Sequence, residues 1–496
     1  MRLPRASGVL LHPTSLPGPF GSGDLGQAAY HFIDWLALAG QKIWQVLPLG
    51  GIGEGNSPYM SSSAFAGNPL LIDLEQLRDE GLLDADDLLP DPRFSPLRVD
   101  FDAVVPWRMQ RLVRAAQAFF KTAGIEQRQV YRRFCEQQAA WLPEYALFMS
   151  LAQAHAGRPW NQWGRALASR EADALERARD QYAKDIDFWT FCQWCFFRQW
   201  QRLHAYAQAK GVRILGDAPI FVAYQSADVW ARQHLFELDA LGQPTVVAGV
   251  PPDYFSATGQ RWGNPLYRWF AHRAEGYAWW TLRIARSFDL VDLLRIDHFR
   301  GLAAYWEIPA SEPTAMVGRW APGPGAELFE AVDKTLGPLP IIAEDLGLIT
   351  PDVDALRRRL DLPGMRVLQF AFGSDDRNPY LPHNHEANAV VYIGTHDNNT
   401  ALGWWAELGE SERAHVRNYL GCNGEDMHWT LLRAACASVA DTAIYPMQDL
   451  LGLDAEHRMN QPGQAQGNWA WRFALEQVQP EHASRLRELC RAFGQP

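Results

Sequence analysis

The sequence predicts a (β/α)8 barrel of the TIM-barrel type, an α/β fold built on a parallel sheet. Short apolar runs alternate with segments of helical period along most of the 496 residues, and this alternation implies parallel strands joined by helical crossovers. Eight such runs are present, which is the number of strands that closes a barrel. The expected strands are 7–12, 42–49, 212–221, 290–297, 339–345, 365–372, 389–397 and 442–451.

The helices expected to cover the barrel lie between most of these runs. Their apolar residues recur every three to four positions, as on the buried face of an amphipathic helix. The expected helices are 27–39, 188–209, 277–288, 326–334, 352–360 and 410–420.

The interval between the second and third strands, 50–211, is too long for a simple connection. A structureless loop of this length would be implausible, and stretches such as 107–120 have an amphipathic helical pattern. We therefore expect a large, mainly helical insertion at 50–211. It would separate the start of the barrel, 1–49, from the rest of the barrel, 212–496.

Three irregular segments are candidates for loops over the mouth of the barrel. Segment 50–69 follows the second strand and is rich in Gly and Ser. Segment 249–270 is dense in Pro, Gly and aromatic residues and lies upstream of the fourth strand, whereas 457–473 follows the eighth. We expect these segments to lie over the mouth as loops.

Charge and composition exclude several classes of partner. The formal net charge of −11 repels phosphate backbones, so no nucleic-acid partner is expected. No segment approaches the ~18 uninterrupted apolar residues of a membrane helix, and residues 1–18 lack the apolar core of a signal peptide. The six cysteines are sparse and scattered, which fits reduced thiols and a cytoplasmic location.

Carboxylates stand where three of the expected strands end. These are Asp297 on the fourth strand, Glu344 on the fifth and Asp397 on the seventh. Active sites of parallel barrels lie at the carboxyl ends of the strands, so the three side chains are expected to converge on one mouth. Asp217, on the third strand, would join them.

Asp297 and Glu344 together suit chemistry at a glycosidic bond. That chemistry requires an acid for the leaving oxygen and a carboxylate facing the sugar carbon, about 5–5.5 Å apart in retaining enzymes. Neighbouring strands lie about 4.8 Å apart, so the ends of consecutive strands can provide this spacing. Arg295 precedes Asp297 by two residues and shares its strand face, where it would keep Asp297 ionised, whereas burial would keep Glu344 protonated.

Each of these patterns also has a structural interpretation. An Arg-x-Asp pair at a strand end is as often a structural ion pair, and Glu344 followed by Asp and Gly is typical of a helix-capping turn. A metal site is not expected, because no HxH, HExxH or EF-hand pattern is present and the carboxylates are separated by whole βα units.

Several polar and aromatic residues suit contacts with a sugar. The hydroxyl-rich segment 57–69 contains Ser57 and Tyr59, although such a segment is also typical of a solvated loop. His298 and His396 adjoin the acids and can bond either sugar hydroxyls or internal partners. The 21 tryptophans supply flat apolar faces that pack on sugar rings as readily as in a core.

An ordered set of motifs resembles the 4-α-glucanotransferases called amylomaltases or disproportionating enzymes, a retaining glycoside-hydrolase family related to the α-amylases. The resemblance covers nearly the whole chain. Its motifs are HPTSLPGPFGSGDLG (12–26), SPYMSSSAFAGNP (57–69), GDAPIFVAYQSADVW (216–230), AGVPPDYFSATGQRWGNP (248–265), RIDHFRG (295–301), AEDLG (343–347), GTHDN (394–398) and RMNQPGQAQGNWAWR (458–472).

This resemblance implies a role for each acid. Asp297 would be the nucleophile that forms a covalent glycosyl-enzyme, Glu344 the general acid and then base, and Asp397 the stabiliser of the distorted sugar. It implies no metal, no organic cofactor and no obligatory protein partner. The residues that it implies for sugar contacts are Tyr59, Asp217, Trp262, Arg295, His396 and Asn468.

The sequence therefore predicts an enzyme that transfers a segment of an α-1,4-glucan to the 4-hydroxyl of an acceptor. Maltooligosaccharides and other α-1,4-glucans would be donors, and glucose or a glucan the acceptor. The residues alone do not separate transfer from hydrolysis by an amylase-like enzyme with the same carboxylates, and the resemblance favours transfer. A non-catalytic glucan-binding protein would be expected to lack an acid, and all three are present.

Overall fold

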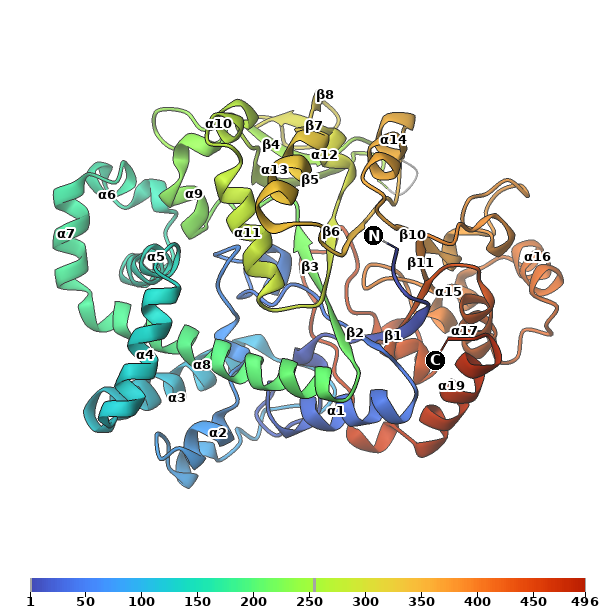
Figure 1. The fold of residues 1–496 in the computed structure, drawn as a ribbon, viewed down its shortest axis with the longest axis horizontal. Coiled ribbons are helices and arrows are strands. Elements are labelled where there is room, and N and C mark those ends of the chain that lie inside the picture. The colour runs from blue at the N-terminus through green and yellow to red at the C-terminus, as the bar shows by residue number, and fades with distance from the viewer. Residues whose placement is uncertain (1, 253–255, 496) are drawn as a thin grey trace.

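A computed structural model describes residues 2–252 and 256–495, and a parallel barrel forms its centre (Figure 1). The strands pair in the order β10-β11-β12-β1-β2-β3-β6-β9, and every pair is parallel. The Ala343 amide donates to the Pro363 carbonyl oxygen at 2.9 Å, which joins the two edges of the sheet. The strands are β1 (Ala6–Leu10), β2 (Ile43–Gln45), β3 (Arg213–Pro219), β6 (Leu293–Asp297), β9 (Ile341–Ala343), β10 (Gly364–Val367), β11 (Ala389–Tyr392) and β12 (Thr442–Pro446). Each strand overlaps an expected run, and the predicted fold class is confirmed.

The barrel strands are shorter than the expected runs, and after two of them the chain turns directly into a helix. Residues Leu368–Phe370 form a 3-10 turn after β10, and Met447–Leu450 form α18 after β12. Leu368 and Met447 are fully buried, so the apolar run continues although the sheet has ended. A short apolar run has the same pattern in a buried strand and in a buried helix.

The helices around the barrel begin and end close to the expected residues. Helix α1 shows why, since its buried residues Ala29, Phe32, Ile33 and Leu36 recur at the helical period. None of the helices in the described part of the chain is long and apolar enough to cross a membrane. The predicted helices are α1 (Gln27–Leu38), α8 (Ala183–Ala209), α11 (Ala278–Phe288), α13 (Ala326–Leu336), α14 (Pro351–Arg359) and α16 (Glu410–Leu420), and the prediction omitted α17 (Met427–Ala437) and α19 (Pro480–Ala492).

Helices also fill the interval between β2 and β3 and extend to one side of the barrel (Figure 1). The long helix α8 ends this interval and leads directly into β3. Buried residues of these helices and of the barrel belong to one continuous apolar core. The division into 1–49, 50–211 and 212–496 stays a prediction. The helices before α8 are α2 (Leu74–Asp79), α3 (Phe101–Thr122), α4 (Ile125–Gln137), α5 (Leu142–Ala154), α6 (Arg165–Ala168) and α7 (Ala172–Gln181).

A small antiparallel sheet lies beside the barrel, with strand order β5-β4-β7-β8. The end of β4 (Val246–Val250) and all of β5 (Gln260–Pro265) fall within 249–270, so the prediction of a loop throughout this segment was wrong. Within that segment, 253–255 lie outside the described residues. On the side away from β5, β4 pairs with β7 (Ala304–Pro309). Strand β7 in turn pairs with β8 (Arg319–Pro322), which follows it in the chain. Because β7 lies far along the chain, local composition rich in Pro and Gly gave no sign of this pairing.

Close packing of β1 on β2 generates a prediction about stability. A Cβ added at Gly8 would collide with the backbone carbonyl of Ile43 on β2. We expect Gly8→Ala to lower the free energy of unfolding by about 1–3 kcal/mol, because backbone at this position has no room to yield. Thermal unfolding of the purified chain measures the effect.

Gly373→Ala is the matched control for this substitution. A Cβ added there has no neighbour within 4 Å, and the residue is exposed. An equal loss of stability in both variants would contradict the proposed clash.

Candidate active site

Neighbouring strands bring Asp297 and Glu344 to the same end of the barrel. Asp297 is the last residue of β6, and Glu344 directly follows β9. These strands are adjacent, with Ile296 paired to Ala343, so both carboxyl groups emerge at the same edge of the sheet. Their arrangement agrees with the expectation that carboxyl ends of parallel strands share one mouth.

A buried arginine connects Asp297 to two further predicted residues. Arg295 Nη2 lies 2.8 Å from Asp297 Oδ1, and its Nη1 donates to Asp217 Oδ2 at 2.5 Å. The hydroxyl of Tyr59 donates to the same Asp217 oxygen at 2.8 Å. Burial raises the pKa of Asp217 to about 6, against the opposing charge of Arg295. The cation stabilises negative charge on Asp297, whose side chain remains 28% exposed.

Glu344 occupies a different environment. Its Oε2 accepts the backbone N–H of His298 at 2.7 Å, and its Oε1 accepts that of Leu346 at 2.8 Å. Burial and the negative charge of Asp297 raise the pKa of Glu344 to about 8, because together they outweigh these hydrogen bonds and the charge of Arg295. Glu344 therefore retains its proton at neutral pH.

Asp397 lies in the connection after β11 and is held by residues from a distant segment. The side-chain amide of Asn460 donates to Asp397 Oδ1 at 2.6 Å, and Arg458 Nη2 donates to the Asp397 carbonyl oxygen at 2.9 Å. His396 Nε2 lies 3.3 Å from Asp397 Oδ2. Asn460 and Arg458 were not among the predicted site residues, although both lie in the motif at 458–472.

Aromatic rings join the predicted sugar-contacting residues around this mouth. Tyr59 stacks on His396 with ring centroids 5.2 Å apart, and the ring of Trp469 lies 5.7 Å from that of Tyr59. On the other side, Trp262 of β5 meets His298 edge to face at 4.8 Å. Trp469 was not among the predicted site residues, and its signal in the sequence is an aromatic residue within the third irregular segment, 457–473.

The structure shows the local conformation of His298 and the hydrogen bond of Ser57. His298 adopts the left-handed conformation, with φ of 52°, directly after Asp297. Burial lowers the pKa of His298 to about 4, so its imidazole is neutral at pH 7. The Ser57 hydroxyl accepts the Tyr59 backbone N–H at 3.2 Å and caps the turn that carries Tyr59.

The amide of Asn468 is engaged within its own loop. Its Oδ1 accepts the backbone N–H of Gln461 at 2.9 Å, and its Nδ2 donates to the Gln464 carbonyl oxygen at 2.8 Å. The next residue, Trp469, reaches Tyr59, so Asn468 lies at the rim of the mouth. Its contact with a sugar stays a prediction, as do the contacts of the other predicted residues.

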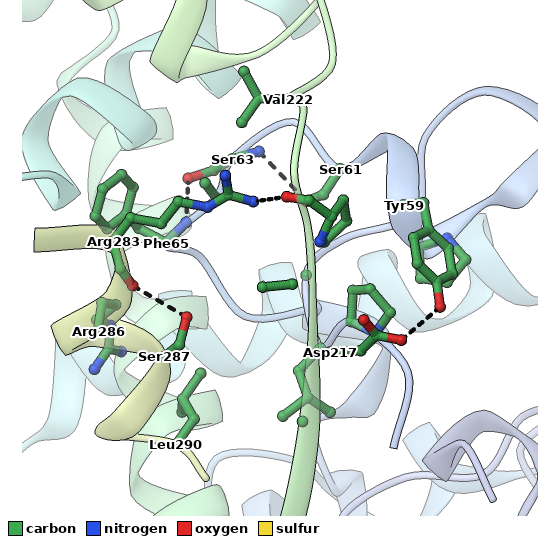
Figure 2. Close-up of a pocket in the computed structure, with 18 of the residues that line it drawn as sticks. Tyr59, Ser61, Ser63, Phe65, Asp217, Val222, Arg283, Arg286, Ser287 and Leu290 are labelled. Carbon is green, nitrogen blue, oxygen red and sulfur yellow. Dashed lines mark hydrogen bonds between the residues drawn. The ribbon is translucent and has the colours of Figure 1, made fainter. Parts of the chain in front are cut away.

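A cavity of about 90 Å³ lies beside the Tyr59–Asp217 hydrogen bond (Figure 2). It is lined by part of β3, residues from 47–50 and 58–66, and one side of α11, where Arg283 donates to the carbonyl oxygens of Pro219 at the end of β3 and of Ile220. Among the described residues, its lining excludes the three acids, so it flanks the mouth. Within the residues that the structure describes, no group of three or more His, Cys, Asp or Glu side chains could hold a metal ion.

Comparisons with known proteins agree with this geometry. A family model described as 4-alpha-glucanotransferase matches residues 11–477. The 4-alpha-glucanotransferase of Thermus thermophilus is 52% identical over 99% of both chains, and that of Synechocystis is 49% identical over 99% of this chain and 98% of its own. The structure of an amylomaltase from Streptococcus agalactiae in complex with acarbose superposes with a TM-score of 0.96, at 39% identity over 99% of both chains. The chain therefore belongs to the 4-alpha-glucanotransferase family, whose enzymes transfer segments of α-1,4-glucans.

Proposed function

We propose that this transfer proceeds with retention, through a covalent bond between the sugar and Asp297. Glu344 acts as general acid and then as general base, and Asp397 stabilises the distorted sugar at the cleavage point. The contrast between the first two carboxyl groups carries the proposal. Asp297 is paired with a cation at 2.8 Å and partly exposed, whereas burial raises the pKa of Glu344 to about 8.

In the first half of the reaction, protonated Glu344 gives its proton to the glycosidic oxygen as Asp297 attacks the anomeric carbon. Arg295 holds Oδ1 of Asp297, which leaves Oδ2 to form the new bond. The bond to the leaving oxygen breaks, and the shortened donor departs with the proton. Glu344 is now a carboxylate.

In the second half, Glu344 takes the proton of the acceptor 4-hydroxyl as that oxygen attacks the anomeric carbon. The bond to Asp297 breaks, and both carboxyl groups return to their starting states. Transfer results when an acceptor sugar reaches the covalent intermediate before water does. The family match favours this outcome over the hydrolase alternative.

The substrates proposed are maltooligosaccharides and longer α-1,4-glucans, with glucose or a glucan as acceptor. Support comes from the rings of Tyr59, Trp262 and Trp469, which offer apolar faces around the acids. The related Streptococcus agalactiae amylomaltase was solved with acarbose. A cytoplasmic location is part of the proposal, and its support is the sparse cysteine content of the sequence.

Substitution of Asp297 by Asn removes the nucleophile while keeping the shape of the side chain. We expect turnover of maltotriose to fall by at least ~10³-fold, with glucan affinity largely kept. Initial rates and equilibrium binding to maltoheptaose measure the two effects. Asp333→Asn, at an exposed aspartate, should leave both unchanged, and near-normal turnover in Asp297→Asn would exclude the nucleophile role.

The raised pKa of Glu344 predicts an alkaline limit to activity. The acid must be protonated for the first step, and it is protonated below its pKa of about 8. We therefore expect kcat/KM for maltotriose to fall as pH rises through about 8. An aryl maltoside with a good leaving group needs less protonation and should show a weaker decline. A kcat/KM that stays flat to pH 10 for both substrates would contradict this assignment.

Products from maltotriose separate transfer from hydrolysis. Transfer redistributes glucose units, so we expect glucose together with maltotetraose and longer oligomers, at a constant number of glycosidic bonds. Chromatography of the products and a reducing-end assay measure both quantities. Products that only shorten, with a rising number of reducing ends, would show a hydrolase.

A further inference from the structure

A second, smaller chamber of about 30 Å³ lies directly behind His396. Five separate parts of the chain border it: the end of β1 with the residues after it, Leu47 after β2, the connection after β11, the end of β12 with α18, and segment 457–473. Its polar lining includes His12, Thr395, His396, Asp449, Arg458 and Trp471. Of these, His396 is also a predicted sugar contact.

Four of the residues that line this chamber have a buried polar atom without a hydrogen-bond partner in the protein. The atoms are His12 Nδ1, Asp449 Oδ2, Arg458 Nε and Trp471 Nε1. Asp449 is 1% exposed, and His12 and Trp471 are also buried. Buried polar atoms are almost always hydrogen-bonded, and one left alone costs about 1–3 kcal/mol. The four residues that carry these atoms all line one small space, which suits a bound ligand.

The chemistry of the four atoms matches water. The indole of Trp471 and the Nε of Arg458 can only donate, Asp449 Oδ2 accepts when the carboxyl is ionised, and the imidazole of His12 takes either role. A water molecule accepts two hydrogen bonds and donates two, so one water could satisfy all four. A buried water needs at least about 10–15 Å³ and two to four polar partners, and the chamber of about 30 Å³ provides both.

Two residues that border the chamber also hold the segment that carries Asp397. Arg458 donates to the carbonyl oxygen of Asp397 at 2.9 Å. Asp449 Oδ1 accepts the backbone N–H of Ala401, the first residue of α15 (Ala401–Glu407), at 2.6 Å. These two bonds lie at the two ends of 397–401. Arg458 and Asp449 thus each have one polar atom that is hydrogen-bonded to 397–401 and another that is buried, and both residues line the chamber.

We propose that the chamber binds one or two ordered water molecules that link Asp449 to Arg458, and that these two residues thereby position Asp397. The bound water connects the side chains on the two ends of 397–401, so the segment is held as one unit. The inference rests on the proposed role of Asp397 in the reaction. Asp449 and Arg458 are positioning residues in this account, since neither needs to touch the sugar.

The first experiment examines the water directly in the unaltered chain. A crystal structure at a resolution that shows ordered solvent should contain a water within hydrogen-bond distance of at least three of the four atoms. A chamber that is dry, or filled by a side chain, would overturn the inference. This result does not depend on whether Asp397 acts in the reaction.

The second experiment uses Asp449→Asn. The Asn oxygen can still accept from Ala401, but an N–H₂ group replaces the acceptor Oδ2 beside the chamber. We expect kcat for maltotriose to fall about 10- to 100-fold with KM changed by less than about threefold, because a small displacement of Asp397 affects the transition state more than binding. Glu456→Gln, at an exposed residue of the same connection, should leave kcat unchanged.

Trp471→Phe supplies an independent variant, because it removes one donor to the water and neither bond to 397–401. A smaller fall in kcat is expected, with the thermal unfolding midpoint recorded for each variant. Normal kcat in both Asp449→Asn and Trp471→Phe would overturn the positioning role. If the water is present but Asp397→Asn is fully active, the proposed role of Asp397 is wrong and the water site stands.

Discussion

The buried guanidinium of Arg295 is the interaction on which the candidate active site depends. It spans two neighbouring strands, bonding Asp217 of β3 at 2.5 Å and Asp297 at the end of β6 at 2.8 Å. The side chains of Arg295 and Asp217 are 4% and 0% exposed. A buried charge that loses its partner is strongly destabilising, so Arg295 and Asp217 require each other. This mutual requirement orients Asp297 and connects it to Tyr59 through Asp217.

The same arginine makes the two central carboxyl groups unlike each other. Asp297 has the cation as a direct partner and keeps contact with solvent. Glu344 accepts two backbone N–H groups, is nearly enclosed, and faces the charge of Asp297, so its proton is retained. Two carboxyl groups in contrasting environments can serve as nucleophile and as acid at one pH. Burial and the position of one cation produce this contrast.

Segments far apart in the sequence complete the mouth around the acids. Tyr59 comes from the interval between β2 and β3, and it contacts both Asp217 and His396 on opposite sides of the barrel. Trp262 comes from the small antiparallel sheet, and Trp469 and Asn460 from the connection after β12. The barrel therefore supplies the acids, and the irregular segments supply the rings and amides that surround them.

The sequence by itself determined the barrel and the position of the acids along it. A strand buried on both faces must be an apolar run, and a charge at its end must lie at the mouth, so Asp297 and Glu344 could be identified without coordinates. Only the tertiary structure decided that 249–270 contains paired strands, that Asn460 binds Asp397, and that Asp449 and Arg458 hold the ends of 397–401. These contacts join groups that are separated along the chain, and no local periodicity records which distant group a side chain or a strand will meet.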